Sequence, residues 1–576
     1  MSVDQALMNQ LITDHIDTWT STMKTKSTAG RGSSKKLELY GVKKLRELIL
    51  ELAVRGKLVP QDPNDEPASV LLERIAKEKA LLVKEKKINK SKPLSKFTKE
   101  DEPFVLPLGW AWSRLGNTGI CATGKTPSTK QTEFFEGTLP FVGPGQITQN
   151  GQLLEAEKFL SSEGLLNSTE AVKGDILMVC IGGSIGKAAI ATQTIGFNQQ
   201  INALRPMIMG SHYLYSAVST SSFYEGLLDK ATGSATPIIN RGKWEELLVP
   251  IAPLPEQHRI VAKVDELMTL CDQLEQQTEA SIEAHQVLVT TLLDTLANSA
   301  NAEELMQNWQ MIAEHFDTLF TTIDSIDQLK QTILQLAVMG KLVPQDPNDE
   351  PAAKLLERIA EEKDQLIKDK KIKKQQALPP IAGDEKPFEL PNGWEWVRLG
   401  NLINLISGQH LKPTEYSEAP LDNGTPYITG PAEFGVIYPS FSKYTNETRA
   451  LASDGDILIT CKGAGLGKLN RSNQTLAISR QLMAIQSICV DQAFLFAVLD
   501  SKYDYFQSKG VGIAIPGISR EDVTELIVAL PPASEQTQIV SKLTEITDIC
   551  NHLKTQLNGL QTTQLILSDA IVELAV

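Results

Sequence analysis

Residues 45–79 read LRELILELAVRGKLVPQDPNDEPASVLLERIAKEK, and residues 329–363 read LKQTILQLAVMGKLVPQDPNDEPAAKLLERIAEEK. The second stretch repeats the first almost half a chain later. Repeats of solenoid proteins have only about 20–45 residues, so this spacing indicates a duplicated half-protein. A chain with two similar halves suits a target that itself has two halves, and duplex DNA is the commonest target of that kind.

The similarity continues beyond the opening of each half. The pattern Pro-x-x-Glu-Gln-x-x-Ile-Val occurs at residues 253–261 and again at 532–540. Between the matched segments, residues 118–235 and 402–514 share only scattered glycines and apolar positions. This pattern predicts a common frame that carries two diverged inserts, as expected if each insert reads a different feature.

The end of the sequence resembles the opening of each half. LSDAIVELAV (567–576) is similar to LRELILELAV (45–54) and to LKQTILQLAV (329–338). We expect a closed, pseudo-symmetric arrangement in which the C-terminal helix meets the helix that opens the first half.

The composition is that of a globular chain with several domains. The 576 residues are 41% hydrophobic, which predicts about three to five domains of ordinary size. The sequence contains no apolar run of the roughly 20 residues that cross a bilayer, and its N-terminus lacks the basic start and apolar stretch of a signal peptide. These features predict a cytoplasmic protein.

The charge and the cysteines exclude some functions. The net charge is −14 and the pI is about 5.2, which argues against a stand-alone, non-specific DNA binder with a basic surface. A DNA reader with local basic residues, or one that shares its phosphate contacts with partner subunits, remains compatible with this charge. The six cysteines are scattered and are predicted to be buried, reduced thiols rather than metal ligands.

Each half is expected to open with two amphipathic helices and to continue into a mixed, β-rich α/β domain. The first pair is predicted at 40–58 and 69–89, with Gly56 as a C-cap, and the second pair at 326–342 and 353–373. The segments expected to form strands or helices inside the two middles are 174–181, 213–228, 457–461 and 491–502.

A long helix is expected after each middle, over residues 256–297 and 535–576. Apolar residues at steps of three and four predict a coiled coil. About 40 residues form a rod of about 60 Å, and two such rods would hold the two middles a fixed distance apart; two ordinary bundle helices without that role are the alternative. The predicted seam positions are Val264, Leu267, Cys271, Leu274, Leu288 and Leu292 in the first helix, and Leu543, Ile546, Cys550, Leu553, Leu557, Leu560, Gln564, Leu567, Ile571 and Leu574 in the second.

Glycine-rich motifs resemble enzyme loops but are incomplete. Residues 141–145 have the F-x-G-x-G form of the cofactor loop of adenine methyltransferases, but the Asn/Asp-Pro-Pro-Tyr/Phe catalytic tetrapeptide does not occur in the sequence. Residues 182–187 and 463–468 end in Gly-Lys without the flanking residues of a P-loop. We therefore predict no catalytic residue. Each Gly-Lys turn either touches a DNA phosphate through its backbone N–H groups and its lysine, or is a plain β-turn.

Polar residues near the ends of short apolar segments are the candidates for contacts with DNA. Gln and Asn bond adenine in a bidentate way, Arg does so with guanine, and Lys binds phosphates. A framework or surface role is the alternative for each candidate. The candidates are Lys125, Thr126, Lys187, Gln199, Gln200, Arg241, Lys412, Lys468, Arg480, Gln481 and Arg520.

With these residues in view, the chain resembles the specificity subunit of type I restriction-modification enzymes over essentially its whole length. The duplicated LAVxGKLVPQDPNDEPA segments and the GDIL and GxxxGK stretches carry this resemblance. So do NQQINALRP (198–206) and GSATPIINRGKWEELLVPIAPLPEQHRIV (233–261).

The resemblance implies a mixed α/β fold with two target-recognition domains, joined by an antiparallel pair of long coiled-coil helices in a pseudo-twofold repeat. Each domain would read one half of an asymmetric, bipartite DNA site. Two methyltransferase subunits that bind S-adenosylmethionine, and restriction subunits that use ATP and Mg²⁺, would join this non-catalytic chain, which holds no cofactor. The expected divisions are a helical region with the first repeat segment (1–102), the first recognition domain (103–255), a long helix (256–297), a helical connector with the second repeat segment (298–386), the second recognition domain (387–534) and a second long helix (535–576).

Two other functions remain as alternatives. One is a stand-alone adenine methyltransferase with a built-in reader, and the other is a duplicated coiled-coil adaptor that never meets DNA. Residues 1–40 and 298–325 are assigned to contacts with other subunits.

Overall fold

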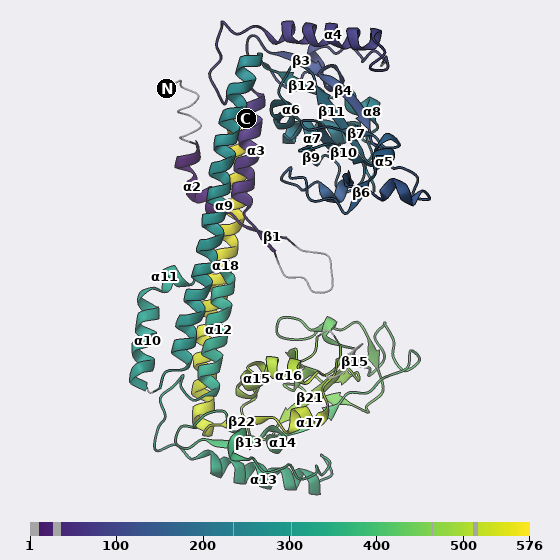
Figure 1. The fold of residues 1–576 in the computed structure, drawn as a ribbon. Helices are drawn as coiled ribbons and strands as arrows, with labels where there is room; N and C mark the ends of the chain where they lie inside the picture. The colour runs from purple at the N-terminus through teal and green to yellow at the C-terminus, as the bar shows by residue number, and fades with distance from the viewer. Residues whose placement is uncertain are drawn as a thin grey trace. The chain divides into compact units, whose positions relative to one another are not determined.

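The computed structural model describes residues 11–26, 36–90, 92–233, 235–300, 302–463, 465–510 and 516–576. It divides into two compact units (Figure 1), one made of Met1–Ile282 with Gly559–Val576 and the other of Glu283–Asn558. Each unit holds one copy of the duplicated segment and one of the two middles. Residues 1–10 and 27–35, which belong to the segment assigned to subunit contacts, lie outside the described residues.

The first unit contains the expected pair of helices, α3 (Tyr40–Val54) and α4 (Ala68–Lys84). After α3 the chain turns at Gly56, which has a φ of +69°. A side chain there would be strained by the left-handed backbone, and its Cβ would lie 2.4 Å from a carbon of Pro107. Glycine therefore fixes the end of α3, a few residues before the end predicted from the sequence.

The first middle folds into two four-stranded sheets with the orders β4-β11-β8-β9 and β6-β5-β10-β7. Strands β5 and β10 pair in parallel, whereas β8 pairs antiparallel with β9 and β11. Strands β3 and β12 form a separate antiparallel pair that joins the two ends of the middle. The strands are β3 (Ala111–Arg114), β4 (Gly119–Thr123), β5 (Leu139–Val142), β6 (Lys158–Leu160), β7 (Glu170–Ala171), β8 (Ile176–Val179), β9 (Ala188–Ile190), β10 (Ile195–Phe197), β11 (Ile201–Pro206) and β12 (Leu248–Ile251).

The helix expected over 213–228 is broken into α6 (Ser211–Val218) and α7 (Ser221–Lys230). The break follows from capping, because the side chain of Thr220 accepts a hydrogen bond from the backbone N–H of Phe223 at 3.2 Å. A short helix, α8 (Arg241–Glu245), precedes β12.

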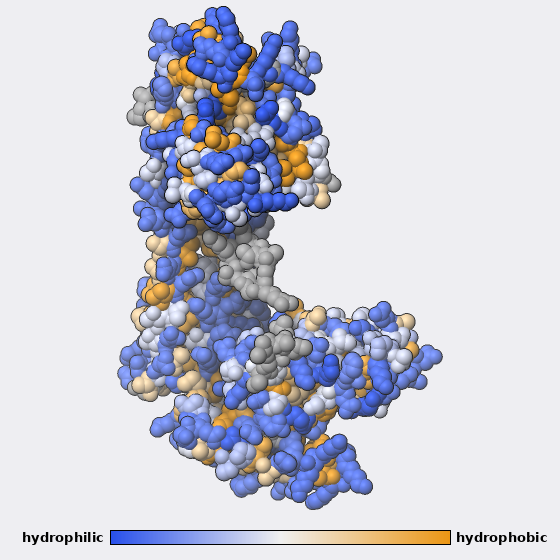
Figure 2. Space-filling model, turned by 45° about the vertical axis from the view of Figure 1, so that its right-hand side comes forward, coloured by the Kyte–Doolittle hydropathy of each residue, from blue (hydrophilic) through white to orange (hydrophobic). Residues whose placement is uncertain are grey.

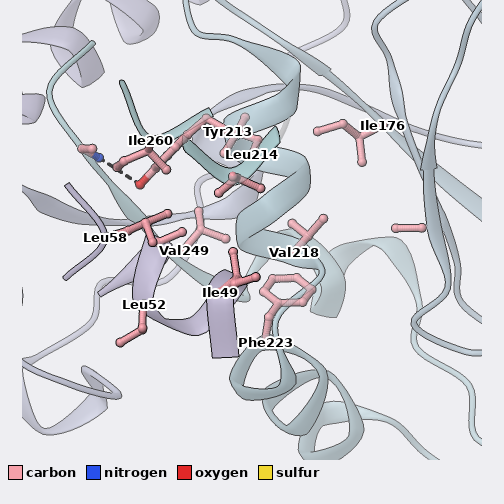
Figure 3. Close-up of a cluster of buried hydrophobic side chains, with 14 of the residues drawn as sticks. Ile49, Leu52, Leu58, Ile176, Tyr213, Leu214, Val218, Phe223, Val249 and Ile260 are labelled. Carbon is pink, nitrogen blue, oxygen red and sulfur yellow. Dashed lines mark hydrogen bonds between the residues drawn. The ribbon is translucent and has the colours of Figure 1, made fainter. Parts of the chain in front are cut away.

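A shared apolar core joins this domain to α3 (Figure 3). Ile49 of α3 and Val218 of α6 belong to the same buried cluster. Tyr213 is fully buried within it, and its hydroxyl donates to the backbone oxygen of Pro250 (2.9 Å) and accepts from the amide of Ala252 (3.1 Å). Because the hydroxyl is satisfied on both sides, this polar group is buried without an unpaired donor or acceptor.

Two long helices, α9 (Leu254–Ala297) and α18 (Ala533–Ala575), contribute residues to both units. In the first unit, Ile571 of α18 lies in the buried cluster that also contains residues of α3 and α9. The Lys57 ammonium donates to the backbone oxygen of Val576 at 2.8 Å, where a cation interacts favourably with the end of a helix. The prediction that the C-terminal helix meets the first repeat helix is confirmed.

The predicted seam of α18 is wrong at Leu560, Leu567 and Leu574, which are exposed, and correct at Ile571, which is buried. Leu567 is exposed and Leu574 is 89% exposed, whereas Ser568 is fully buried and its hydroxyl donates to that of Thr22 at 3.1 Å. This end of α18 packs against α3 and the residues after α2 (Ile16–Ser21), so its buried stripe is set by those neighbours rather than by a strict heptad.

The second unit repeats the same parts. Helices α12 (Ile323–Val338) and α13 (Ala352–Lys368) return as expected, and they follow α10 (Ala302–Glu314) and α11 (Phe316–Leu319). The end of α9 and the first half of α18 pack on α12, with Val289, Leu293, Leu296 and Cys550 buried. The seam predicted at Leu288 is displaced by one residue, because Leu288 is exposed and Val289 is buried.

The second middle has the same sheet topology as the first, with the orders β14-β21-β18-β19 and β16-β15-β20-β17, a parallel β15–β20 pair and an antiparallel β13–β22 pair. The strands are β13 (Glu395–Arg398), β14 (Ile403–Ser407), β15 (Thr425–Ile428), β16 (Tyr444–Thr445), β17 (Leu451–Ala452), β18 (Ile457–Thr460), β19 (Leu469–Arg471), β20 (Leu476–Ile478), β21 (Leu482–Ser487) and β22 (Ile527–Leu530). The helices of this domain are α14 (Leu399–Leu402), α15 (Gln492–Asp500), α16 (Tyr503–Lys509) and α17 (Arg520–Thr524).

A buried contact at the start of each long helix follows the repeat. The indole N–H of Trp110 donates to the carboxylate of Glu256 at 3.0 Å, and that of Trp394 donates to Glu535 at 2.9 Å. Burial raises the pKa of both glutamates. The duplication thus preserves the joint between each domain and the long helix that follows it.

The sequence predicted buried thiols and no segment that crosses a membrane. Cys489 is exposed and Cys121 is partly buried, so the prediction of buried thiols is wrong for Cys489. Among the described residues, none of the helices combines the length and the apolar character that crossing a membrane requires. The cysteines that are buried as predicted are Cys180, Cys271, Cys461 and Cys550.

Candidate nucleic-acid interface

In the first domain, the turn between β10 and β11 presents Gln199. Asn198 shapes this turn, because its side-chain oxygen accepts from the amide of Gln200 at 3.0 Å and its nitrogen donates to the side-chain oxygen of Gln200 at 3.2 Å. Gln199 is exposed, and its side-chain oxygen accepts from the hydroxyl of Thr126 at 2.7 Å. The amide nitrogen of Gln199 keeps two N–H donors for an acceptor on a base.

Lys125 lies beside the same turn. Its backbone N–H donates to the oxygen of Phe197 at 3.0 Å, and its own backbone oxygen accepts from the hydroxyl of Ser168 at 2.7 Å. The side chain of Lys125 is exposed. The structure therefore brings Lys125, Thr126, Gln199 and Gln200 together on a fixed backbone, with Lys125 and Gln199 exposed and Thr126 and Gln200 partly buried.

Lys187 lies on the Gly-Lys turn between β8 and β9. This turn adjoins the first one, because the amide of Cys180 donates to the backbone oxygen of Gln200 at 2.8 Å. Gly186 has a φ of +85°, and a Cβ there would lie 2.5 Å from the ring of Tyr224, so the glycine serves the turn. The amides that donate to backbone oxygens within the domain are those of Gly182, Ile185, Gly186 and Lys187.

In the second Gly-Lys turn, four amides also donate hydrogen bonds within the domain. Those of Gly463, Leu466, Gly467 and Lys468 donate to backbone oxygens. These amides are therefore engaged within the domain, and the phosphate contact considered for the two turns stays a prediction that rests on their remaining groups and their lysines. The lysines remain: Lys468 is exposed and Lys187 is half-buried.

Arg241 begins α8 and is paired on its own helix. Its guanidinium contacts the carboxylate of Glu245 at 3.1 Å, and its side chain is half-exposed. Two residues earlier, the amide of Ile239 donates to the backbone oxygen of Cys180 at 3.0 Å, which ties this segment to the Gly-Lys turn.

In the second domain, the turn between β20 and β21 presents Arg480 and Gln481. Ser479 takes the place of Asn198, because its hydroxyl accepts from the amide of Gln481 at 3.2 Å. The side chains of Arg480 and Gln481 are exposed. Gly430 packs closely here, since a Cβ on it would come within 2.4 Å of the side-chain oxygen of Gln481.

Lys468 lies next to this turn, because the amide of Cys461, at the start of its loop, donates to the backbone oxygen of Gln481 at 2.7 Å. Lys412 lies in the loop after β14, where its amide donates to the carboxylate of Glu415 at 2.8 Å and its side chain is exposed.

Arg520 is held by the framework of the second domain. Its guanidinium donates to the hydroxyl of Ser407 at 2.6 Å and to the backbone oxygen of Leu405 at 2.9 Å. Both partners belong to β14, so Arg520 braces that strand from the first turn of α17.

The profile of the family described as "Type I restriction modification DNA specificity domain" matches residues 107–284 and 391–560. The chain belongs to this family. The specificity subunit of the EcoAI type I restriction enzyme of Escherichia coli is 42% identical over 99% of this chain and 100% of its own length. The EcoEI specificity subunit of Escherichia coli is 40% identical over 99% of both chains.

A solved structure from work on the complex assembly and conformational transition of the type I R-M system is also similar, with a TM-score of 0.54 and 20% identity. It covers 82% of this chain and 99% of its own. At this identity the likeness concerns the fold alone. The resemblance stated from the sequence is confirmed, and the protein is a type I specificity subunit.

The sequence pointed to Asn198 as a polar residue that could bond adenine, but it did not show that Asn198 and Ser479 shape turns of this specificity subunit. Asn198 and Ser479 shape the turns that present the candidate side chains, and Asn and Ser ahead of a turn are a signal for such local hydrogen bonds. The loop that carries Val436 was also missed, because an exposed apolar residue cannot be told from a core residue by its type. Among the described residues, none of the groups of His, Cys, Asp or Glu is arranged to hold a metal ion.

The two domains of the specificity subunit differ at one buried carboxylate. In the first, Arg205 binds Asp175 through bonds of 2.8 and 3.0 Å. In the second, the equivalent Asp456 accepts from the neutral side chain of Gln486 at 2.9 Å. Burial raises the pKa of Asp456 to about 6.

This difference predicts a pH dependence of stability. A carboxyl whose pKa is higher in the folded state binds its proton more tightly there, so the free energy of unfolding falls as the pH rises from about 4 to about 6. We expect a fall on the order of 1–3 kcal/mol, measured by urea unfolding across this range. Asp456→Asn is expected to remove the part of the fall that comes from this carboxyl and Gln486→Arg to reduce that part, whereas the exposed Asp504→Asn is the matched control. An unchanged slope in Asp456→Asn contradicts the assignment.

Proposed function

We propose that this specificity subunit reads an asymmetric, bipartite DNA site, with residues 103–255 reading one half and residues 387–534 the other. The observation that carries the proposal is the equivalent turn of the two domains. One backbone frame presents Asn-Gln-Gln at 198–200 and Ser-Arg-Gln at 479–481. A shared frame with different side chains suits two readers of two different sequences.

The chemistry of the candidates suggests their roles. Gln199, Gln200 and Gln481 suit adenine, and Arg480 suits guanine, because each can form two hydrogen bonds to the base edge in the major groove. The remaining candidates Lys125, Thr126, Lys187, Lys412 and Lys468 suit phosphate contacts that orient the domain. Arg241 and Arg520 are proposed as supports of the reading surface, since each is engaged within its own domain.

We propose that the chain acts inside a complex and carries out no catalysis itself. Two methyltransferase subunits would bring S-adenosylmethionine, and restriction subunits would bring ATP and Mg²⁺. The net charge of −14 is compatible with this division, because partner subunits can supply cationic surface around the duplex. A cytoplasmic location belongs to the same proposal.

The two arginines provide a paired test. Arg480→Ala is expected to weaken binding to the specific site by about 1–3 kcal/mol while stability is retained. Arg520→Ala is expected to lower the free energy of unfolding by about 1–2 kcal/mol, because it removes two hydrogen bonds to β14. Binding is measured with methyltransferase subunits present, and stability by urea unfolding. If Arg480→Ala and the unchanged chain bind the site equally well, Arg480 does not contact a base and is a surface residue.

We also propose that α9 and α18 set the gap between the half-sites. Inserting four residues after Leu557 is expected to lengthen the gap by about 6 Å, or about two base pairs, while both half-sites stay the same. Adenine methylation mapping measures the gap. An unchanged gap leaves the two helices with a purely structural role.

Genome-wide mapping of methylated adenines in cells with and without the intact system tests the proposed function. We expect one split motif that is methylated only when this chain is present. Methyl transfer by the purified chain alone would instead establish a stand-alone methyltransferase. The absence of any sequence-dependent footprint in the presence of methyltransferase subunits would establish an adaptor that does not bind DNA.

A further inference from the structure

The loop between β15 and β16 carries three consecutive exposed apolar residues. Val436 is fully exposed, Ile437 is 57% exposed and Tyr438 is 49% exposed. The surface seen in Figure 2 is mostly hydrophilic, with hydrophobic residues in small patches. Adjacent exposed apolar side chains oppose solubility and point to a contact with another molecule.

Hydrogen bonds hold this tip, residues 435–438, in a defined shape. The amide of Gly435 donates to the backbone oxygen of Tyr438 at 3.2 Å, which closes the turn. The side chain of Asn470 donates to the backbone oxygen of Gly435 at 2.9 Å, and the amide of Arg471 donates to that of Ile437 at 3.3 Å. Both partners belong to β19. The tip is therefore preformed and loses little conformational freedom on binding.

The loop that carries the tip packs against the candidate DNA-reading turn of the same domain. Its loop begins at Gly430, which lies against Gln481. A Cβ on Gly465, in the Gly-Lys turn, would come within 2.6 Å of the next residue, Pro431. The base of the loop therefore packs on the turns that carry Lys468 and Arg480, and the tip rests on β19, which follows Lys468 directly.

The charges around the tip favour a polyanion. Lys468 and Arg480 are exposed cations on the neighbouring turns. The carboxylate of Glu433, in the same loop, is directed toward its own backbone, because one of its oxygens accepts from the amide and hydroxyl of Thr429 and from the amide of Gly430. Exposed cations on the turns against which this loop packs suit a duplex better than an apolar protein surface.

The first domain carries a polar tip on the same frame. Its loop also starts with a Gly-Pro step and a one-turn 3₁₀ helix, at Pro144–Gln146 in the first domain and Pro431–Glu433 in the second. In the first domain the turn at 148–152 exposes Gln149, Asn150 and Gln152, Ile147 before it is buried, and the exposed Leu154 follows it. The chemistry of the tip thus differs between the two domains while its support is kept, as expected of an element that sets specificity.

We propose that the Val436-Ile437-Tyr438 tip contacts thymine methyl groups in the half-site read by residues 387–534. The C5 methyl of thymine is the apolar group that base pairs display in the major groove, and apolar side chains recognise it. The inference rests on the proposed function and names one chemical feature of the sequence that the second domain reads.

Uracil substitution tests this contact directly. The complex with methyltransferase subunits is bound to duplexes that contain the mapped site, in which thymines of this half-site are replaced one at a time by deoxyuridine. For the unchanged chain, at least one replacement is expected to weaken binding about fourfold, the factor that burial of one methyl group brings. With Val436→Ser/Ile437→Ser, the same replacement is expected to have no further effect. Leu166→Ser, at an exposed leucine of the first domain, serves as the control that keeps the uracil effect.

The outcomes separate the inference from the proposed function. If the unchanged complex binds the mapped site but no uracil replacement weakens it, the thymine contact is wrong and the proposed function stands. The same holds if the serine variant keeps the full uracil effect, or loses only its assembly with methyltransferase subunits, which would assign the tip to a protein contact. If the unchanged complex shows no preference for the mapped site, the proposed function fails and the inference fails with it.

Discussion

A chain in which residues 103–255 are replaced by the corresponding segment of a relative will direct methylation to a site with one half changed and the other half kept. The first and last strands of the exchanged segment pair with each other, since Ala111 of β3 lies opposite Ile251 of β12, so the segment brings both partners of this pair with it. Each mismatched base pair costs about 1–3 kcal/mol, so several mismatches together abolish methylation of the old site. The measurement is genome-wide mapping of methylated adenines.

The donor segment must keep the contacts to the repeat helix. Glu51 of α3 accepts from the amide and the hydroxyl of Ser222, at 2.8 and 3.1 Å, and this buried carboxylate would lose the hydroxyl donor if the serine were changed. The reciprocal exchange of residues 387–534 is the control and is expected to change the other half only. A change in both halves, or in neither, rejects the two-reader proposal.

Trp244→Ala is expected to give a large loss of stability. Trp244 is fully buried in the first domain, and its indole N–H donates to the sulfur of Met178 at 3.1 Å. Removing a buried tryptophan leaves a cavity and costs about 3–5 kcal/mol. The variant is therefore expected to unfold at lower urea concentration and to lose recognition of one half-site.

Trp309→Ala is the matched control, because Trp309 of α10 is 37% exposed. Its replacement is expected to cost less than about 1 kcal/mol and to leave both half-sites readable. Similar losses for the two variants would mean that burial of Trp244 does not limit the stability of its domain.

The duplication made much of the architecture predictable. Residues 45–79 and 329–363 have nearly the same local chemistry, so they form the same helix–turn–helix in both units. Trp110 and Trp394 also hold equivalent buried glutamates. Family membership could be stated from the sequence for the same reason, since the order of matched segments is specific.

The side-chain roles could not be derived in this way. Arg480 and Arg520 both looked like base readers, but only the structure shows that Arg520 donates to Ser407 and Leu405 of β14. These partners lie more than a hundred residues away in the chain, and a local sequence pattern cannot predict such a contact.

The sequence by itself determined the duplicated plan, the family and the pairs of helices, because these depend on local patterns that recur. The sequence also placed Val264, Leu267 and Cys271 on the buried face of α9, and tertiary structure alone decided where the buried stripe departs from the heptad. A heptad places Leu567 and Leu574 inside, but α18 there packs against α3 and Thr22, so Ser568 is buried and Leu574 is exposed. Burial depends on which neighbours a helix meets, and a helix can meet different neighbours along its length.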